Sequence, residues 1–407
     1  MKKVLILVLI FILSICSMLL IPSVSAEDFV IEDGVLLSYS GNDNIISIPD
    51  NVYYIADGAF KDNTNISKLN LNADVRIIGN EAFYGCTSLK EIKGDKNVNY
   101  VGAYAFYNTP LYAGNELIKV GSVLVKNNAN GELVADKSIT MIAPYAFADN
   151  NDLTAFRASE NLSVIGEGAF YRCSSLKTVD VSQHLSSVGP LAFYGTAFVN
   201  DSSEDFVTLG DGVLLQYKGN SASVKIPQSV KHIGGGAFYS DTDVTDIKVN
   251  EGVTSIGKRA FANCSSLKTI SLPQSLVMID DEAFARCKKL ESIIIPENVE
   301  LMGESIFYAC GSLERAEFLN SADLSSGTFV NCATLGFVKL DGSVSSIGSS
   351  AFLNCANLTD LSVGDNVTSI GEDAFKGCDL LTISCNESSY AYEYSVSNGI
   401  NVIQCGD

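Results

Sequence analysis

The chain has 407 residues, of which 47% are hydrophobic and 18% are charged, with 27 basic and 47 acidic side chains. The net charge of −20 argues against nucleic-acid binding, which needs clustered Lys and Arg, and against docking on an anionic membrane surface. Two histidines leave little material for a metal cluster, and so hydrophobic a composition excludes a disordered chain.

The first segment has the features of an export signal. Two lysines open the chain, an apolar run covers residues 4–21, and small residues lead up to Ala26. This order predicts a signal peptide over residues 1–26 and therefore a secreted or cell-surface protein. The apolar run is also long enough to remain as an uncleaved membrane anchor, and this alternative stays open. After cleavage we expect no membrane span, because no second apolar segment of that length follows.

One pattern recurs along the rest of the chain. Phe, usually preceded by Ala, returns every 22 or 23 residues, apart from two longer intervals. The positions are Phe60, Phe83, Phe106, Phe147, Phe170, Phe193, Phe238, Phe261, Phe284, Phe307, Phe329, Phe352 and Phe375. Ile lies five residues before most of them, and an alternating apolar stretch of the form Leu-x-x-Ile-x-Leu begins six residues after. Such registered copies predict stacked turns that share one continuous core, with a short parallel strand in each turn.

The repeated pattern Ile-Pro-x-x-Val-x-x-Ile-Gly-x-x-Ala-Phe-x-x-Cys-x-x-Leu is complete or nearly so at residues 226–244, 272–290 and 295–313. It resembles the bacterial surface leucine-rich repeat proteins of the BspA-like type. The resemblance covers residues 45–385 and implies an α/β repeat, a leucine-rich repeat solenoid with a curved parallel sheet of about 13 coils of 23 residues. The copy around Phe329 departs from the pattern, because it is one residue short and has Leu324 in place of Ile-Gly.

Three inserted segments divide the array. Gly34, Gly121 and Gly212 each begin an apolar stretch 26 residues before the next repeat Phe, and residues 33–42 and 211–220 are almost identical. The Asp-Gly and Gly-Asn turn signals of these two segments predict β-hairpins, and the shared spacing places an equivalent insertion at Gly121. We therefore expect three modules, at about residues 27–113, 114–200 and 201–385.

Both ends of the array need covers, because an end turn exposes an open sheet edge. The first hairpin predicts an N-terminal cap over residues 27–45, ahead of a solenoid over residues 46–385. Residues 386–407 predict a C-terminal cap, in which residues 388–399 form a Ser-capped helix and residues 400–403 form a final strand.

The third residue after each Phe is small and is most often Cys. Thr109, Thr196 and Asp241 occupy the position in three copies, and the other ten copies have Asn63, Cys86, Asn150, Cys173, Cys264, Cys287, Cys310, Cys332, Cys355 and Cys378. Equivalent side chains of stacked turns point the same way, whereas a disulfide needs facing Cβ atoms, so we expect a ladder of buried, reduced thiols. Zinc binding and nucleophilic catalysis are weaker alternatives. Cys385 and Cys405 lie outside the ladder, and a disulfide between them is an open alternative.

The sequence contains no recognisable catalytic, phosphate-binding or calcium-binding motif. The residues eight, ten and twelve positions after each Phe are expected to face outwards on the sheet, which the resemblance implies is the concave binding surface. The best ligand-contact candidates are Arg315, Glu317, Phe337 and Lys339, an aromatic side chain among charges of both signs, as interfaces favour. A mixed polar surface that only keeps the solenoid soluble is the alternative.

These observations predict a monomeric binding scaffold without cofactor, metal or enzymatic activity, acting on an extracellular protein or glycan. The resemblance implies adhesion to host or matrix proteins or to other cells. A structural envelope spacer without a specific ligand is the first alternative. An uncharacterised extracellular enzyme is less favoured, because the inserted stretches 110–138 and 197–225 contain neither His nor Cys.

Overall fold

The computed structural model describes residues 28–114, 117–128, 130–340 and 342–404, so the predicted signal peptide and Cys405 lie outside the described residues. Within these ranges the chain forms two compact units. The first unit contains residues 28–97 and 104–114, and the second contains residues 98–103 and the described residues from 117 onwards. The grouping into three modules stays a prediction.

Nearly every repeat turn contributes one short strand to each of two faces, on which the strands of neighbouring turns pair in parallel. The Leu-x-x-Ile-x-Leu stretch forms the first, which we call the strand face, and the residues around the Ile before each Phe form a two-residue strand of the second. In the first unit the strand face comprises β3 (Ile45–Ser47), β5 (Lys68–Asn70) and β7 (Glu91–Lys93), and the two-residue strands are β4 (Tyr54–Ile55) and β6 (Ile77–Ile78).

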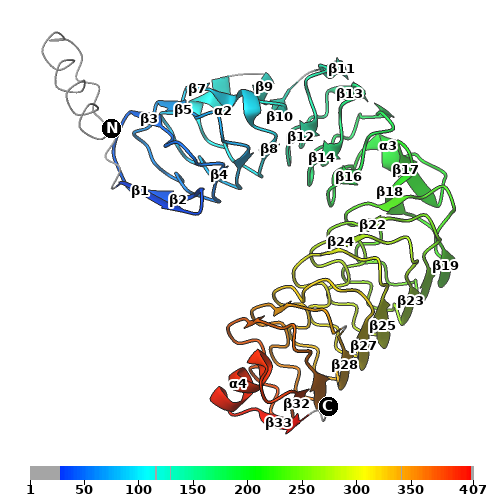
Figure 1. The fold of residues 1–407 in the computed structure, drawn as a ribbon. Coiled ribbons are helices and arrows are strands. Elements are labelled where there is room, and N and C mark those ends of the chain that lie inside the picture. Colours follow the sequence, from blue (N-terminus) through cyan, green and yellow to red (C-terminus); the bar gives the residue numbers. More distant parts are fainter. Residues whose placement is uncertain (1–27, 115–116, 129, 341, 405–407) are drawn as a thin grey trace, which may run out of the picture. The chain divides into compact units, whose positions relative to one another are not determined.

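The second unit repeats this arrangement over more turns, and Figure 1 shows β23, β25, β27 and β28 of its strand face in one row. The strands of this face are β11 (Gly131–Val134), β13 (Leu153–Arg157), β15 (Thr178–Asp180), β19 (Ser223–Lys225), β21 (Asp246–Lys248), β23 (Thr269–Ser271), β25 (Ser292–Ile295), β27 (Arg315–Phe318), β28 (Phe337–Lys339), β30 (Asp360–Ser362), β32 (Thr382–Cys385) and β33 (Asn401–Gln404). The two-residue strands are β8 (Tyr100–Val101), β12 (Met141–Ile142), β14 (Val164–Ile165), β16 (Ser187–Val188), β20 (His232–Ile233), β22 (Ser255–Ile256), β24 (Met278–Ile279), β26 (Leu301–Met302), β29 (Ser346–Ile347) and β31 (Ser369–Ile370).

The repeat phenylalanines form the centre of the core. Each of the thirteen is at most 6% exposed, and neighbouring rings stack along the solenoid. The ring centroids of Phe261 and Phe284 are 5.2 Å apart, and those of Phe284 and Phe307 are 5.5 Å apart. The copy that departs from the pattern keeps this packing, because Leu324 is buried and forms a single parallel bridge to Ile347. The repeat period therefore predicts the core of each unit.

The inserted segments are β-hairpins, as predicted. Each pairs two antiparallel strands: β1 (Phe29–Glu32) with β2 (Val35–Tyr39), β9 (Leu117–Val120) with β10 (Val123–Asn127), and β17 (Phe206–Leu209) with β18 (Val213–Tyr217). The second strand of each hairpin also pairs in parallel with the next two-residue strand, so that each hairpin builds an extra turn. Tyr39 and Tyr217 extend the aromatic stack there, 5.4 Å from Phe60 and 5.0 Å from Phe238.

The fold is accordingly a parallel β-solenoid of about 16 turns, because the hairpins add to the thirteen turns that carry Phe. Helix is sparse in the described part of the chain: α2 (Pro110–Gly114), α3 (Ala197–Asn200), α4 (Tyr390–Ser397) and the 3₁₀ turn η2 (Asp95–Asn97). The repeats return through turns, in which two residues per copy adopt positive φ, rather than through helices. None of the described helices has the length and apolar character needed to cross a bilayer.

The predicted C-terminal helix is α4. The hydroxyl of Ser389 accepts a hydrogen bond from the backbone N–H of Tyr392, and Gly399, with φ of 70°, follows the last helical turn. The final strand, β33, pairs in parallel with β32, and Tyr394 of the helix lies edge-on to Phe375 at 6.1 Å. The helix therefore covers the end of the aromatic stack.

Candidate functional site

The strand face of the second unit alternates buried and outward-facing side chains. In β27, Ala316 and Phe318 are buried, whereas Arg315 and Glu317 face outwards. The parallel register places Arg315 opposite Phe337 and Glu317 opposite Lys339. All four sequence-predicted contact residues therefore lie together, on two adjacent strands, because residues at equivalent positions of stacked turns are neighbours.

Arg315 links this group. Its guanidinium carbon lies 3.9 Å from the centroid of the Phe337 ring, and its Nη2 lies 2.6 Å from Oε1 of Glu317. The ring of Phe337 remains 37% exposed beneath the guanidinium. The arginine is thus held flat on an aromatic surface by a cation–π contact and an ion pair, which reduces the conformational entropy that a partner must remove.

Two exposed apolar side chains that sequence reasoning missed extend the group. Ile294, 53% exposed, lies opposite Glu317 in the register of β25 and β27. Leu380, 58% exposed, lines an open hollow together with Phe337, Glu314 and Thr359. We call Ile294, Arg315, Glu317, Phe337, Lys339 and Leu380 the strand-face patch. Ile294 has a sequence signal, because it lies ten residues after Phe284, whereas Leu380 lies five residues after Phe375, at an offset with no regular apolar residue.

The cysteines of the predicted ladder are buried, and each thiol donates a hydrogen bond to a backbone carbonyl of the preceding turn. The Sγ atom of Cys86 donates to the carbonyl oxygen of Phe60 at 3.1 Å, and Cys173 and Cys264 make the same contact at 3.0 Å. The contact recurs at Cys287, Cys310, Cys332, Cys355 and Cys378, at 3.0–3.2 Å. None of these eight thiols forms a disulfide in the described residues. Cys385 is buried as well, and the disulfide to Cys405 that the sequence leaves open involves a residue outside the described ranges.

Asn63 and Asn150 occupy the ladder position just after a hairpin turn. Each side-chain oxygen accepts a backbone N–H within its own turn, from Asn65 or Asp152, and each amide donates to a carbonyl of the preceding hairpin segment. Thr109 and Thr196 take this position in the copies just before the second and third hairpins, and the Thr196 hydroxyl caps α3 by accepting the backbone N–H of Val199. The residue type at the ladder position therefore depends on the neighbouring segment: Asn bonds to a preceding hairpin, and Thr stands before a short helix.

Burial suppresses ionisation of two ladder thiols, Cys86 and Cys173. Desolvation raises the pKa of Cys86 and of Cys173 to about 12, from an ordinary value of 9.0. A thiol with this pKa is protonated at neutral pH and is a poor nucleophile and a poor metal ligand. In the described residues, no group of three or more His, Cys, Asp or Glu side chains is placed to hold a metal ion.

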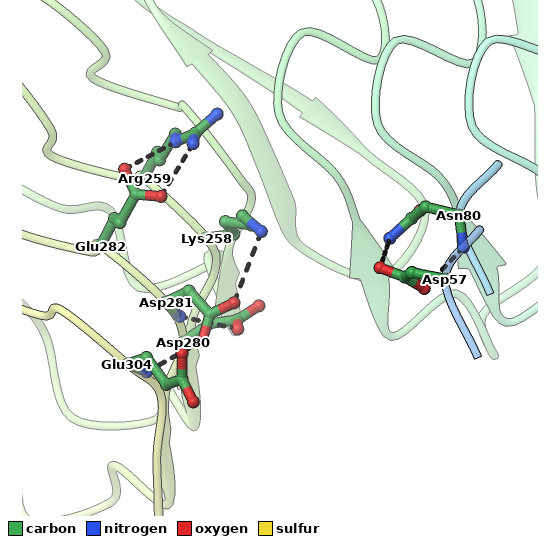
Figure 2. Close-up of polar contacts among 8 residues, drawn as sticks. All are labelled: Asp57, Asn80, Lys258, Arg259, Asp280, Asp281, Glu282 and Glu304. Carbon is green, nitrogen blue, oxygen red and sulfur yellow. Dashed lines mark hydrogen bonds and ion pairs between the residues drawn. The ribbon is translucent and has the colours of Figure 1, made fainter. Parts of the chain in front are cut away.

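A second set of polar contacts lies on the turns that carry Phe, and Figure 2 shows its members. The Nη2 and Nε atoms of Arg259 contact both carboxylate oxygens of Glu282, at 2.7 and 3.0 Å. Lys258 lies 3.4 Å from the carboxylate of Asp281, which also accepts the backbone N–H of Glu304 at 2.9 Å. The Arg259 guanidinium lowers the pKa of Glu282. These contacts tie three successive turns together through side chains.

The same device occurs in the first unit. Asp57 accepts the backbone N–H of Asn80 at 2.7 Å and its side-chain amide at 2.9 Å (Figure 2). Asp57 and Asp281 both lie three residues before a repeat Phe, so they occupy equivalent positions of the repeat. The carboxylate at this position bonds the next turn in both units, which indicates a structural role.

Comparison with known proteins agrees with this geometry. The family described as BspA type leucine-rich repeat region (six copies) matches residues 38–113, 110–200, 214–336 and 322–404. The chain belongs to this family. The BspA-type repeat accounts for the resemblance seen in the sequence, and its matches extend into the C-terminal cap. No curated protein matches the chain.

Several solved structures are similar to the chain at low sequence identity. A leucine-rich cell surface protein from Faecalibacterium prausnitzii is 20% identical, with 78% of this chain and 91% of that chain covered and a TM-score of 0.35. The pneumococcal vaccine antigen PcpA is 19% identical, with 93% and 96% covered and a TM-score of 0.39. A leucine-rich repeat protein from Bacteroides ovatus is 20% identical, with 93% and 97% covered and a TM-score of 0.34.

Proposed function

We propose that this BspA-type leucine-rich repeat protein is exported and acts at the cell surface as a non-enzymatic binding scaffold. It adheres to a host or matrix protein, or to a protein on another cell, as a monomer and by contact along its strand face. The export signal at residues 1–26 and membership of the repeat family support this proposal. The net charge of −20 favours a partner with a neutral or basic contact surface over nucleic acid or an anionic membrane.

The strand-face patch is the observation that carries the proposal. An exposed aromatic ring with an arginine on it, flanked by exposed Ile294 and Leu380, has the composition that protein interfaces concentrate at their centres. The arginine is oriented before any partner arrives, by Glu317 on the same strand. All members of the patch except Leu380, which lies in a turn, are on stacked strands, and this pairing holds their backbone in a fixed register.

The proposal is tested by surface plasmon resonance of the intact chain over immobilised extracellular-matrix extract and over fixed bacterial cells. Phe337→Ala and Arg315→Ala should each weaken saturable binding about tenfold or more, because central aromatic and arginine residues dominate interface affinity. Lys225→Ala is the matched control, because Lys225 faces outwards at the repeat position of Glu317 but lies on β19. Its binding should equal that of the unaltered chain.

The structural spacer predicts a different outcome. A spacer would show no saturable binding to any of these surfaces, while the unaltered chain and all three variants remained equally folded by circular dichroism. Equal binding by the unaltered chain and by Phe337→Ala and Arg315→Ala would instead keep a binding function but remove it from the strand-face patch.

A further inference from the structure

Tyrosines recur on the turns that carry Phe, and in the second unit two successive turns between a pair of them carry alanine instead. The residue directly after Phe is tyrosine at Tyr84, Tyr107, Tyr171, Tyr194, Tyr239 and Tyr308. Where two neighbouring turns both carry it, the rings stack, at 5.7 Å for Tyr84 and Tyr107 and at 5.5 Å for Tyr171 and Tyr194. Between Tyr239 and Tyr308 the two intervening turns carry Ala262 and Ala285 instead.

The two alanines leave a groove where two tyrosine rings would lie. It has a volume of about 450 Å³, its floor includes Ala262 and Ala285, and Tyr239 and Tyr308 line it as well. Three strand spacings separate the turns of these tyrosines, or about 14 Å. This volume falls in the range of small-molecule sites and suits one or two sugar-sized rings.

The other lining residues are polar and include an arginine without a carboxylate partner. Arg259 and Glu282 neutralise each other through their two-point contact. Arg286 lies with its guanidinium carbon 5.5 Å from the centroid of the Tyr308 ring and forms no ion pair with any residue that the structure describes. Its side chain is exposed, and Asn263 and Ser305 beside it offer an amide and a hydroxyl.

We propose that this groove binds a carboxylate-bearing sugar, such as a uronic or sialic acid at the end of a glycan. Arg286, steadied by the face of Tyr308, matches a carboxylate, which guanidinium groups bind through two parallel hydrogen bonds. Asn263, Ser305 and Glu282 offer both donors and acceptors for the hydroxyl groups of a sugar ring. The half-exposed ring of Tyr239 supplies an apolar surface with a polar edge, on which the C–H face of a sugar packs.

The composition of the groove favours a short acidic sugar over other anionic ligands. A chain with a net charge of −20 repels a polyanion, so a ligand with one carboxylate suits a single unpaired arginine. A docked peptide usually needs a deep apolar pocket for an anchor side chain, and the floor here offers only alanine methyl groups. The site lies on the turns rather than on the strand face, so it does not depend on the strand-face patch.

Two variants and one control test the groove. Arg286→Gln removes the cation, and Ala285→Tyr fills the groove with the side chain that this position carries elsewhere. The segment Tyr171-Arg172-Cys173 is the natural precedent for Ala285→Tyr, because residues 285–287 read Ala-Arg-Cys and Tyr171 stacks on Tyr194 without disturbing the repeat. Arg172→Gln is the control, because Arg172 occupies the same repeat position as Arg286 but next to a tyrosine.

Binding is measured by isothermal titration and saturation-transfer NMR of the intact chain with glucuronic acid and N-acetylneuraminic acid, and with glucose as the neutral probe. We expect at least one acid to bind, Arg286→Gln and Ala285→Tyr each to weaken it about tenfold or more, and Arg172→Gln to leave it unchanged. Glucose binding as tightly as the acids would overturn the proposal, as would an effect of Arg172→Gln equal to that of Arg286→Gln.

Absence of binding by both acids at millimolar concentration would also overturn it. So would binding of a blocked glutamate tripeptide, Ac-Gly-Glu-Gly-amide, in place of the sugars, since the occupant would then be a peptide. If Phe337→Ala lost binding to matrix extract but still bound the sugar, the groove and the strand-face patch would be two independent sites.

Discussion

Removing one ring from the middle of the aromatic stack tests how the solenoid is held together. Phe284 is 0% exposed and lies between the rings of Phe261 and Phe307, at 5.2 and 5.5 Å. Replacing a buried phenylalanine by alanine costs about 3–5 kcal/mol, and the loss of two stacked neighbours places Phe284→Ala near the upper end, at about 4–5 kcal/mol. The terminal ring, Phe375, is 6% exposed, stacks on Phe352 and meets Tyr394 edge-on at 6.1 Å, so Phe375→Ala should cost about 1 kcal/mol less because its outer side is less closely packed.

The assay combines urea unfolding, followed by circular dichroism, with hydrogen exchange read by mass spectrometry. Because each turn contacts only its neighbours, Phe284→Ala should speed amide exchange in the turns of Phe261, Phe284 and Phe307 and leave the turns of Phe147 and Phe170 unchanged. A cost below about 1 kcal/mol would refute the packing argument. Uniformly faster exchange through the whole second unit would refute the nearest-neighbour argument.

Two further predictions concern backbone approach and ionisation. Gly235→Ala should destabilise the chain by about 1–3 kcal/mol in urea unfolding, because a Cβ atom there would lie 2.6 Å from the backbone nitrogen of Pro190. Gly311→Ala, whose added Cβ meets nothing within 4 Å, should be nearly neutral, and equal costs would contradict the argument. The raised pKa of Cys86 and Cys173 predicts that stability is intact below pH 9.0, where thiols of the unfolded chain begin to ionise, and falls as pH rises towards about 12. Each thiol lowers the free energy of unfolding by up to about 1.4 kcal/mol per pH unit in that window. In urea unfolding between about pH 9 and 11, the double variant Cys86→Ala/Cys173→Ala should therefore lose stability less steeply with pH than the unaltered chain. The same dependence of stability on pH in both proteins would exclude the two thiols as its cause.

The repeat period predicts the fold because every copy must place its apolar residues in the same core. Phe284, Leu290 and Ile293 recur at fixed offsets in other copies, and all three are buried. The same logic predicts that Arg315 and Phe337 are neighbours, since they lie at equivalent positions of adjacent turns. The sequence therefore predicts the core positions and the neighbours on adjacent strands, because both depend only on spacing within the repeat.

Other features depend on contacts between segments that have no shared spacing. The turn signals at Asp33 and Gly34 predict a hairpin, but not that its second strand joins the two-residue strands as an extra turn. Leu380 follows Phe375 at an offset that carries no regular apolar residue, so its exposure next to Phe337 is visible only in the structure. The groove has a partial sequence signal, because Ala262 and Ala285 lie between Tyr239 and Tyr308 at the position after Phe, but only the structure shows that an open space results.

The most direct test of the account is the affinity of the intact chain for immobilised extracellular-matrix extract, compared with that of Phe337→Ala. The account predicts saturable binding that Phe337→Ala weakens about tenfold or more and that Lys225→Ala leaves unchanged. Saturable binding with the same affinity in all three proteins, each equally folded, would contradict the claim that the strand-face patch makes this solenoid an adhesive scaffold.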